Sequence, residues 1–375
     1  MQIPFINLRV EPDFNPKVKT RWEQSLEKSQ FIAGEALIEL NHKILDFTKA
    51  KNFIACANGT DALQIALRAV GVGINDCVLL PDFTFWATYE AVINVGARPV
   101  MVDICPQDFQ MDFDLFLIAI EKYSPKAIIL VHLYGWCSIR LAEFREFCKV
   151  KNIYLIEDGA QAIGSFYQGK PIFENAFIAT TSFYPAKVLG AAGDGGGIFT
   201  NNAEIAQICT QLSNHGRSSH YGHQFVGWNS RLDEVQAHYL VVALDYLALR
   251  IESRKNSEKK YLEFQSNFAS NKVLPLEMKA APSEINSNGY LQVSLSKTSY
   301  KELSDQLKIK GINCGNVYPS PMSAQIGAGE LNELVTKDKI TYEICNRIIN
   351  LPLFPYMHDE EINYVCQSLS DLCKT

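Results

Sequence analysis

The sequence predicts an α/β protein with a large domain built on a mainly parallel sheet and a smaller α+β domain after it. Over the first two thirds of the 375 residues, short apolar runs alternate with helical patterns, which is typical of βαβ units whose sheet is covered on both faces. One long amphipathic segment, 234–264, then precedes a C-terminal part in which strand and helix patterns mix. We therefore expect a large domain at 1–245 and a smaller one at 246–375.

Five apolar runs are predicted to be successive strands of the large domain: 76–81, 97–103, 126–135, 152–158 and 176–183. Helices are expected at 61–73, where glycines end the pattern, and at 141–150. In the C-terminal part we predict a strand at 289–296 and helices at 299–312 and 359–369. Ligands of open α/β sheets bind at the carboxyl ends of the strands, so we expect the site there.

Composition argues against several classes of protein. The formal net charge of −6 is spread without runs of like charge, so we expect neither nucleic acid nor a membrane as a partner. The first residues lack a basic segment followed by a long apolar one, which predicts a cytoplasmic protein. The ten cysteines form no CxxC pair and the seven histidines no HxxxH or HExxH spacing, so we expect no disulfide framework and no metal.

A turn and a helix start are expected directly after a strand that ends near Cys56. The backbone amides of Gly59, Thr60 and Asp61 would then favour an anion such as phosphate. An ordinary N-cap followed by a helix explains the same residues equally well, so both interpretations stay open at this point.

A second apolar strand delivers Glu157 and Asp158 to its carboxyl end, and Gln161 follows three residues later. A carboxylate in this position is costly to bury unless it is paired. Asp158 therefore needs a cationic or protonated partner, which a ligand would supply; a capping aspartate or a structural ion pair is the alternative.

Lys187 lies five residues after Ser182, which ends another strand. Pro185 prevents a regular helix here, so a loop would aim the lysine at a fixed point. A lysine beside cationic or apolar groups loses its proton readily and becomes a nucleophile, although most lysines are exposed at the surface. The small residues that follow favour a site, because they leave room for backbone to approach a bulky ligand. They are Gly190, Ala191, Ala192, Gly193, Gly195, Gly196 and Gly197.

A phosphate site, a strand-end aspartate and a loop lysine, in that order, are what pyridoxal 5'-phosphate (PLP) requires. The carboxylate of Asp158 would keep the ring nitrogen protonated, and Lys187 would hold the aldehyde and later move a proton. Trp86, near another strand end, is a candidate to stack on the ring, although a single aromatic residue is more often part of the core.

With these residues in place, the chain resembles the DegT/DnrJ/StrS family of sugar aminotransferases, a group of fold-type I PLP enzymes. The resemblance runs from about Phe31 to the C-terminus and implies a mainly parallel, seven-stranded-type sheet in the large domain. It is carried by these stretches together: ANGTDALQIAL, PDFTFWAT, VHLYG, IEDGAQAIG, SFYPAKVLGAAGDGG, HGR, VGWNSRLDEVQA and LPLFPYM.

The resemblance implies roles in cofactor binding. Lys187 is the implied Schiff-base lysine and Asp158 the partner of the ring nitrogen, while Gln161 contacts the ring hydroxyl and Trp86 stacks. The implied phosphate ligands are Gly59, Thr60 and Ser182.

Asn229 of the partner subunit would also reach this phosphate, which implies a homodimer with shared active sites; without the resemblance, Asn229 would be interpreted as a turn residue. Candidate substrate residues are Tyr184, His223 and Tyr318.

The implied reaction moves an amino group from glutamate, by way of pyridoxamine phosphate, to a keto-sugar attached to a nucleoside diphosphate. The product would serve amino-sugar biosynthesis for surface glycans such as the O-antigen of lipopolysaccharide. Relatives with histidine in place of Lys187 are dehydratases, so the lysine favours transamination. The stretch LGAAGDGG is more similar to enzymes of 3-keto sugars than to the TTGEGG-like stretch of enzymes that aminate C4.

The nature of the sugar is less sharply indicated. CANGTDALQI and NSRLD resemble enzymes that act on N-acetylated 3-keto-hexuronic acids, such as a UDP-2-acetamido-3-keto-hexuronic acid. Yet Phe225 lies where an arginine is common there, and Val317 where a histidine is. Without these partners for a carboxylate, a neutral 3-keto-6-deoxyhexose is favoured. His223, Arg217 or His220 could compensate, so the uronate stays open, as does a 4-keto sugar.

Two other classes of protein compete. A noncatalytic PLP-binding regulator is disfavoured by the intact set of Lys187, Asp158 and Gln161. An unrelated nucleotide-binding α/β protein would need a GxGxxG fingerprint after its first strand, whereas GDGGG here precedes a predicted strand.

Overall fold

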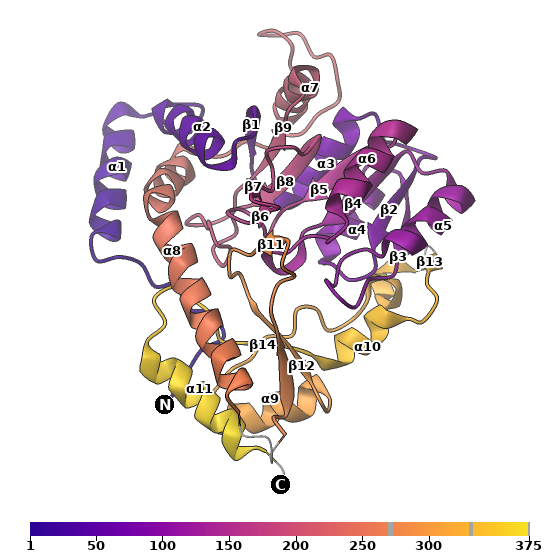
Figure 1. Cartoon of the computed structure of the whole chain (residues 1–375). Coiled ribbons are helices and arrows are strands. Elements are labelled where there is room, and N and C mark those ends of the chain that lie inside the picture. The colour runs from indigo at the N-terminus through magenta and orange to yellow at the C-terminus, as the bar shows by residue number, and fades with distance from the viewer. Residues whose placement is uncertain (269–272, 330–332, 374–375) are drawn as a thin grey trace.

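Figure 1 shows a large central sheet with helices around it and a smaller part of the molecule beneath it, which ends near the C-terminus. The structure is a computed structural model that describes residues 1–268, 273–329 and 333–373. The large part is mainly parallel, as predicted.

The large sheet has eight strands in the order β1-β9-β8-β5-β4-β2-β3-β13. β9 is antiparallel to both of its neighbours, and the remaining neighbours are parallel. The strands are β1 (Asn52–Cys56), β2 (Cys77–Pro81), β3 (Arg98–Val102), β4 (Ala127–Val131), β5 (Tyr154–Asp158), β8 (Ile178–Ser182), β9 (Gly196–Thr200) and β13 (Leu334–Val335). The sheet is thus one strand larger than the expected seven-stranded type, because β13 joins it from the C-terminal part of the chain.

All five predicted strands are present, as β2, β3, β4, β5 and β8. The run at 126–135 is shorter than predicted, since β4 ends at Val131. Tyr134 (φ 66°) and Gly135 (φ 75°) adopt left-handed backbone that cannot continue a strand.

The helices before the smaller part are α1 (Phe14–Lys28), α2 (Glu35–Thr48), α3 (Gly59–Ala69), α4 (Trp86–Asn94), α5 (Phe113–Tyr123), α6 (Leu141–Lys151) and α7 (Ala203–Ser213). The predicted long helix is α8 (Glu234–Ser266), which runs from beside α2 down to α11 (Figure 1). It therefore connects the two parts of the molecule without a break.

The smaller part contains an antiparallel sheet of β10 (Leu276–Lys279), β12 (Gln292–Ser296) and β14 (Ile348–Leu351), with α9 (Tyr300–Ile309), α10 (Ile340–Arg347) and α11 (Asp359–Asp371). A third small sheet pairs β6 (Phe166–Tyr167) with β7 (Lys170–Pro171) and β11 (Ile285–Asn286). Each of these two sheets thus pairs strands that are far apart in the sequence.

The first residues of the chain pack on the smaller part. Ile3 is fully buried in its core, its amide donates to Gly311 O (2.8 Å), and its carbonyl accepts from Asn313 N (3.0 Å). These residues, which we assigned to the large domain, therefore contribute to the smaller core. The division at 245/246 falls inside α8 and stays a prediction.

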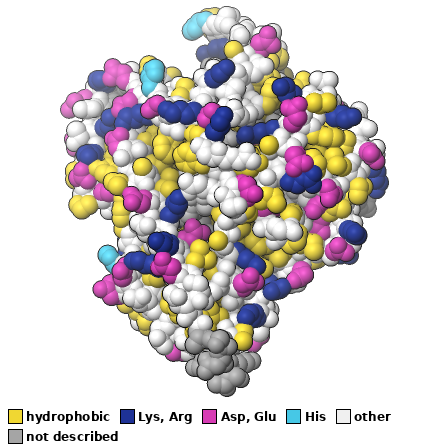
Figure 2. Space-filling view, viewed as in Figure 1, with side chains coloured by type: hydrophobic (Ala, Val, Ile, Leu, Met, Phe, Trp, Pro, Cys, Tyr) yellow, Lys and Arg dark blue, Asp and Glu magenta, His cyan; other side chains and the backbone are white. Residues whose placement is uncertain are grey.

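On the face shown in Figure 2, acidic and basic side chains are interspersed. Among the described residues, no helix is long and apolar enough to cross a membrane. The same residues hold no group of three or more His, Cys, Asp or Glu side chains that could bind a metal ion.

Candidate active site

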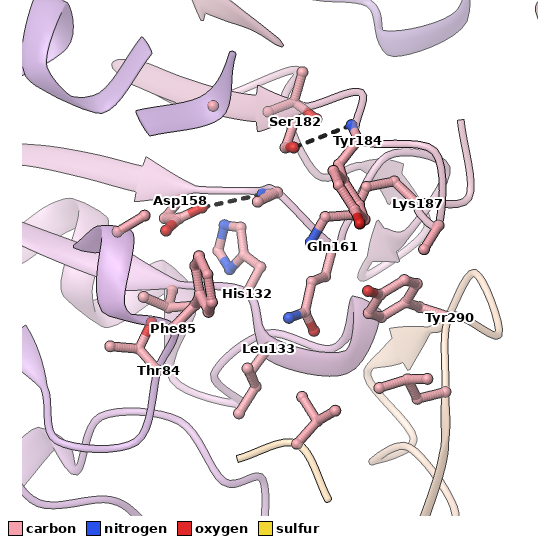
Figure 3. Close-up of a pocket in the computed structure, with 18 of the residues that line it drawn as sticks. Thr84, Phe85, His132, Leu133, Asp158, Gln161, Ser182, Tyr184, Lys187 and Tyr290 are labelled. Carbon is pink, nitrogen blue, oxygen red and sulfur yellow. Dashed lines mark hydrogen bonds between the residues drawn. The ribbon is translucent and has the colours of Figure 1, made fainter. Parts of the chain in front are cut away.

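A cavity of about 550 Å³ lies at the carboxyl ends of the parallel strands β4, β5 and β8 (Figure 3). Its volume is in the range of small-molecule sites. Most of the predicted site residues line it: Gly59, Thr60, Asp158, Gln161, Ser182, Tyr184, Lys187 and Tyr318. Trp86, His223 and Asn229 do not.

The N-terminus of α3 forms one end of the cavity. Asn58 caps this helix, because its Oδ1 accepts a hydrogen bond from Asp61 N (2.8 Å). The Asp61 amide is thus already used, and only Gly59 and Thr60 of the predicted anion site line the cavity. A Cβ atom on Gly59 would lie 2.8 Å from Cβ of Ser182, so glycine is needed to bring the helix start and the end of β8 together.

Asp158, at the end of β5, is 6% exposed and faces the cavity. Its Oδ2 accepts from Thr88 Oγ1 (3.0 Å) and its Oδ1 from Ala160 N (3.1 Å). No described residue forms a salt bridge with Asp158. A ligand could therefore supply the cationic or protonated partner that we expected from the sequence. A protonated pyridine nitrogen is such a partner.

Glu157, its neighbour, is a structural residue instead. The carboxylate is fully buried and accepts two hydrogen bonds from Arg145 (both 2.8 Å) and one contact from His132 Nε2 (2.8 Å). Burial raises its pKa, but Arg145 and His132 outweigh that effect and lower it to about 2. His132 also lines the cavity (Figure 3), and we did not single it out, although it lies within the VHLYG stretch.

Gln161 links two tyrosines at the cavity wall. Its Oε1 accepts from Tyr134 N (2.6 Å), and its Nε2 donates to the Tyr318 hydroxyl (3.0 Å). Desolvation raises the pKa of Tyr318 well above its usual value, so its hydroxyl stays neutral. The pair therefore offers an uncharged hydrogen-bonding edge to a ligand.

Lys187 lies in the loop after β8, where its amide donates to Tyr184 O (2.8 Å). Its side chain points into the cavity, with Nζ 5.3 Å from the centre of the Tyr290 ring (Figure 3). No described carboxylate forms a salt bridge with it. The loop thus aims the amine inward, as Pro185 led us to expect.

The glycines after Lys187 have a different task from the one we predicted. Cβ atoms on Gly190, Gly196 and Gly197 would lie within 2.2–2.4 Å of Pro185 O, Asn58 backbone and the Phe53 ring. These glycines therefore let the loop and β9 pack against the protein itself. Of residues 188–197, Asp194 alone lines the cavity.

Trp86, which we predicted to stack on the cofactor ring, does not line the cavity. The helix α4 begins at this residue and turns the indole away from the cavity, where it stacks on Tyr89 with ring centres 4.9 Å apart. Phe85, one residue earlier, lines the cavity instead and lies 5.7 Å from the Tyr318 ring. Phe85 is thus the aromatic candidate to face a cofactor ring.

Two further predicted residues lie on the segment that follows α7, which extends from the body of the molecule (Figure 1). His223 is exposed and contacts His215 O through Nδ1 (2.8 Å), and Asn229 Oδ1 accepts from Arg231 (2.6 Å). Neither reaches the cavity of its own chain. This excludes His223 as a ligand of its own cavity here, and is compatible with the expectation that Asn229 serves a partner subunit.

The model of the DegT/DnrJ/EryC1/StrS aminotransferase family matches residues 12–370. The chain is 35% identical over 98% of its length to the whole of a UDP-2-acetamido-2-deoxy-3-oxo-D-glucuronate aminotransferase from Pseudomonas aeruginosa. It is 32% identical over 98% of its length to 99% of a dTDP-3-amino-3,6-dideoxy-alpha-D-galactopyranose transaminase from Aneurinibacillus thermoaerophilus.

Solved structures of aminotransferases have a similar fold. A DegT/DnrJ/EryC1/StrS aminotransferase from Brucella abortus superposes with a TM-score of 0.92 at 29% identity, over 99% of both chains. NtdA from Bacillus subtilis, whose structure contains the cofactor PMP, gives a TM-score of 0.87 at 27% identity, over 99% of this chain and 85% of that one.

Proposed function

Because the chain belongs to the DegT/DnrJ/EryC1/StrS aminotransferase family, we propose that it transfers an amino group from glutamate to a nucleotide-linked 3-keto sugar. The family and its relatives indicate a PLP-dependent sugar aminotransferase. One observation carries the proposal: Lys187, an Asp158 without an ion-pair partner among the described residues and the N-terminus of α3 open into one cavity.

The residues of this cavity fit PLP. Gly59, Thr60 and Ser182 would bind its phosphate at the helix start, and Asp158 would pair with its ring nitrogen. When bound, the cofactor supplies an aldehyde that exchanges nitrogen with substrates and a ring that withdraws electrons. The neutral Tyr318 and Gln161 would contact the edge of the ring.

Lys187 would do the proton transfers. Its amine would take the proton from the α-carbon of glutamate in the first half-reaction and return one to the former carbonyl carbon of the sugar in the second. Leu133, which is buried and lines the cavity, would limit water around these atoms.

For the sugar, we propose a 3-keto-6-deoxyhexose. The sugars in the names of both relatives have their keto or amino group at C3, which favours C3 over C4. Val317 lines the cavity, and the uronate enzymes that the sequence resembles have a histidine at this position. Phe225, where those enzymes often have an arginine, does not line the cavity. Tyr184 and Tyr318 are the candidate sugar contacts. The uronate and the 4-keto sugar are the alternatives.

We place the enzyme in the cytoplasm, in amino-sugar biosynthesis for surface glycans such as the O-antigen of lipopolysaccharide, and working as a homodimer.

The test is a mass-spectrometric assay of the purified protein with PLP, glutamate and a panel of 3-keto and 4-keto nucleotide sugars. We expect replacement of the ketone by an amine for the 3-keto-6-deoxy sugar. K187A should lower turnover by at least about 10⁴-fold, because proton transfer and covalent attachment are both lost. Lys301→Ala, which changes an exposed lysine of α9, is the control and should keep full activity.

Each other outcome selects an alternative. Amination of the uronate alone, or of a 4-keto sugar alone, would overturn the proposed sugar but keep the aminotransferase. A protein that binds PLP through Lys187 and aminates nothing would support the noncatalytic regulator.

A further inference from the structure

Arg254 is a buried cation in the wall of the cavity. It lies in α8, is 5% exposed, and donates from Nη1 to the carbonyls of Tyr290 (3.3 Å) and Leu353 (3.2 Å). Its Nε has no hydrogen-bond partner among the described residues, and no described carboxylate lies within salt-bridge distance of it. Burial lowers the pKa of Arg254 to about 10, which still leaves it charged at neutral pH.

Arg250, the other buried arginine among the described residues, is paired, and so is the half-buried Arg145. Arg250, one turn earlier in α8, binds both carboxylate oxygens of Glu11 (3.0 and 2.7 Å). Arg145 likewise makes a bidentate contact with both carboxylate oxygens of Glu157. A buried charge that lacks such a partner is costly, which indicates that an anion is meant to complete the site.

We propose that Arg254 binds a carboxylate group of a substrate, through the edge of the guanidinium formed by Nε and Nη2. This rests on the proposed function. The planar edge presents two parallel N–H donors, which match a carboxylate. Tyr290 contacts both Arg254 and Lys187, since its carbonyl accepts from Arg254 and its ring faces Lys187 Nζ. A carboxylate at Arg254 would therefore belong to a molecule that reacts at Lys187.

Two substrates could supply this carboxylate: the amino-acid donor, or a sugar oxidised to a carboxylate at C6. Binding of unreactive compounds to the PLP-loaded protein separates them without any need for turnover. Glutarate represents the donor. Glucuronic acid and glucose, each linked to UDP and to dTDP, represent a sugar with and without the carboxylate.

We expect Arg254→Gln to weaken the binding of one carboxylate by about 100-fold, as for the loss of a buried charged hydrogen-bonding partner. Weaker glutarate binding assigns the site to the donor. Loss of a preference for glucuronic acid over glucose assigns it to the sugar. In both cases the binding of nucleotide-linked glucose stays unchanged.

The proposal is overturned if wild type binds neither carboxylate, if wild type and variant bind both equally, or if nucleotide-linked glucose loses affinity to the same extent, which would indicate the diphosphate. A wild type that aminates sugars while failing this test refutes only the role of Arg254. A wild type that binds glutarate through Arg254 but aminates nothing refutes only the proposed function.

Two further variants guard against misfolding. Arg254→Lys keeps the charge but loses the paired donors, so carboxylate affinity should fall by about 10-fold at an unchanged melting temperature. Arg250→Lys, in the same helix but outside the cavity, should lower the melting temperature and leave carboxylate binding as in wild type.

Discussion

Glu157 and Asp158 are neighbours in β5, yet their carboxylates have different surroundings. Glu157 is surrounded by Arg145 and His132, whereas Asp158 accepts only neutral donors and faces the cavity. Successive residues of a strand point to opposite faces, which explains how adjacent carboxylates separate into a structural and a ligand-binding role.

Glu157→Gln should destabilise the protein at pH 7 by about 3 kcal/mol, because Arg145 then loses its charged partner. The folded-state pKa of about 2 lies below the usual 4.5. The ionised carboxylate therefore stabilises the folded protein above pH 4.5, and this contribution is lost as the pH falls toward 2. Urea unfolding at pH 7, 5 and 4 should show the gap between wild type and variant closing below pH 4.5.

A matched control is Glu143→Gln. This exposed glutamate also binds an arginine, Arg140, through two hydrogen bonds, and should cost at most about 1 kcal/mol. A gap for Glu157→Gln that stays constant with pH would mean that lost packing, rather than lost charge, is responsible.

That Lys187 and Asp158 line the cavity could be predicted from the sequence, because local signals mark them: Asp158 ends an apolar strand, and Lys187 follows another strand and a proline. Arg254 carries no such signal, since RIESRKNSEKK looks like the polar face of any helix. Its burial depends on the carbonyls of Tyr290 and Leu353, which are 36 and 99 residues away. A local sequence pattern cannot predict the burial of a side chain whose hydrogen-bond partners are so far away in the sequence.

At the scale of elements, α3 and β8 pack closely where they meet at the cavity. Gly59→Ala should weaken PLP binding by about 10-fold or more and lower the melting temperature, because the new Cβ would meet Ser182 Cβ at 2.8 Å. Absorbance titration with PLP and thermal unfolding measure both effects.

Gly73→Ala is the control for this variant, because the nearest atom to its Cβ would be 4.0 Å away and its φ is not positive. It should leave PLP binding unchanged. Equal PLP affinity for Gly59→Ala and wild type would mean that the end of β8 moves aside, and would weaken the assignment of the phosphate to this helix start.

The elements themselves were largely predictable, whereas their ends and partners were not. The strands β2 to β5 and β8 were found from apolar runs, but a start of α4 at Trp86 decides that Phe85 and not Trp86 faces the cavity. In the same way, the glycines of 190–197 were visible in the sequence, while their neighbours depend on how β9 pairs with β1 and β8.

At the scale of the whole molecule, both parts of the chain build the cavity. Tyr290, Tyr318 and Leu353 come from the C-terminal part, and Arg254 from the helix that joins the parts. The sequence predicted the two parts but not this sharing, nor that Ile3 and β13 would cross between them. Such pairings join residues hundreds of positions apart and leave no periodic pattern.

The remaining prediction concerns two copies of the chain. Tyr221 and Val226, on the segment that carries Asn229, are 87% and 86% exposed, as suits a surface covered by a partner. If Asn229 serves the partner's phosphate site, a mixture of Lys187→Ala and Asn229→Asp chains should regain about a quarter of wild-type activity after subunit exchange, since half of the dimers then hold one intact site. Lys187→Ala mixed with Asp158→Asn should regain nothing, because these residues line the same chain's cavity. Activity no higher than the mean of the separate variants would place Asn229 in a local role, as a turn residue beside Arg231.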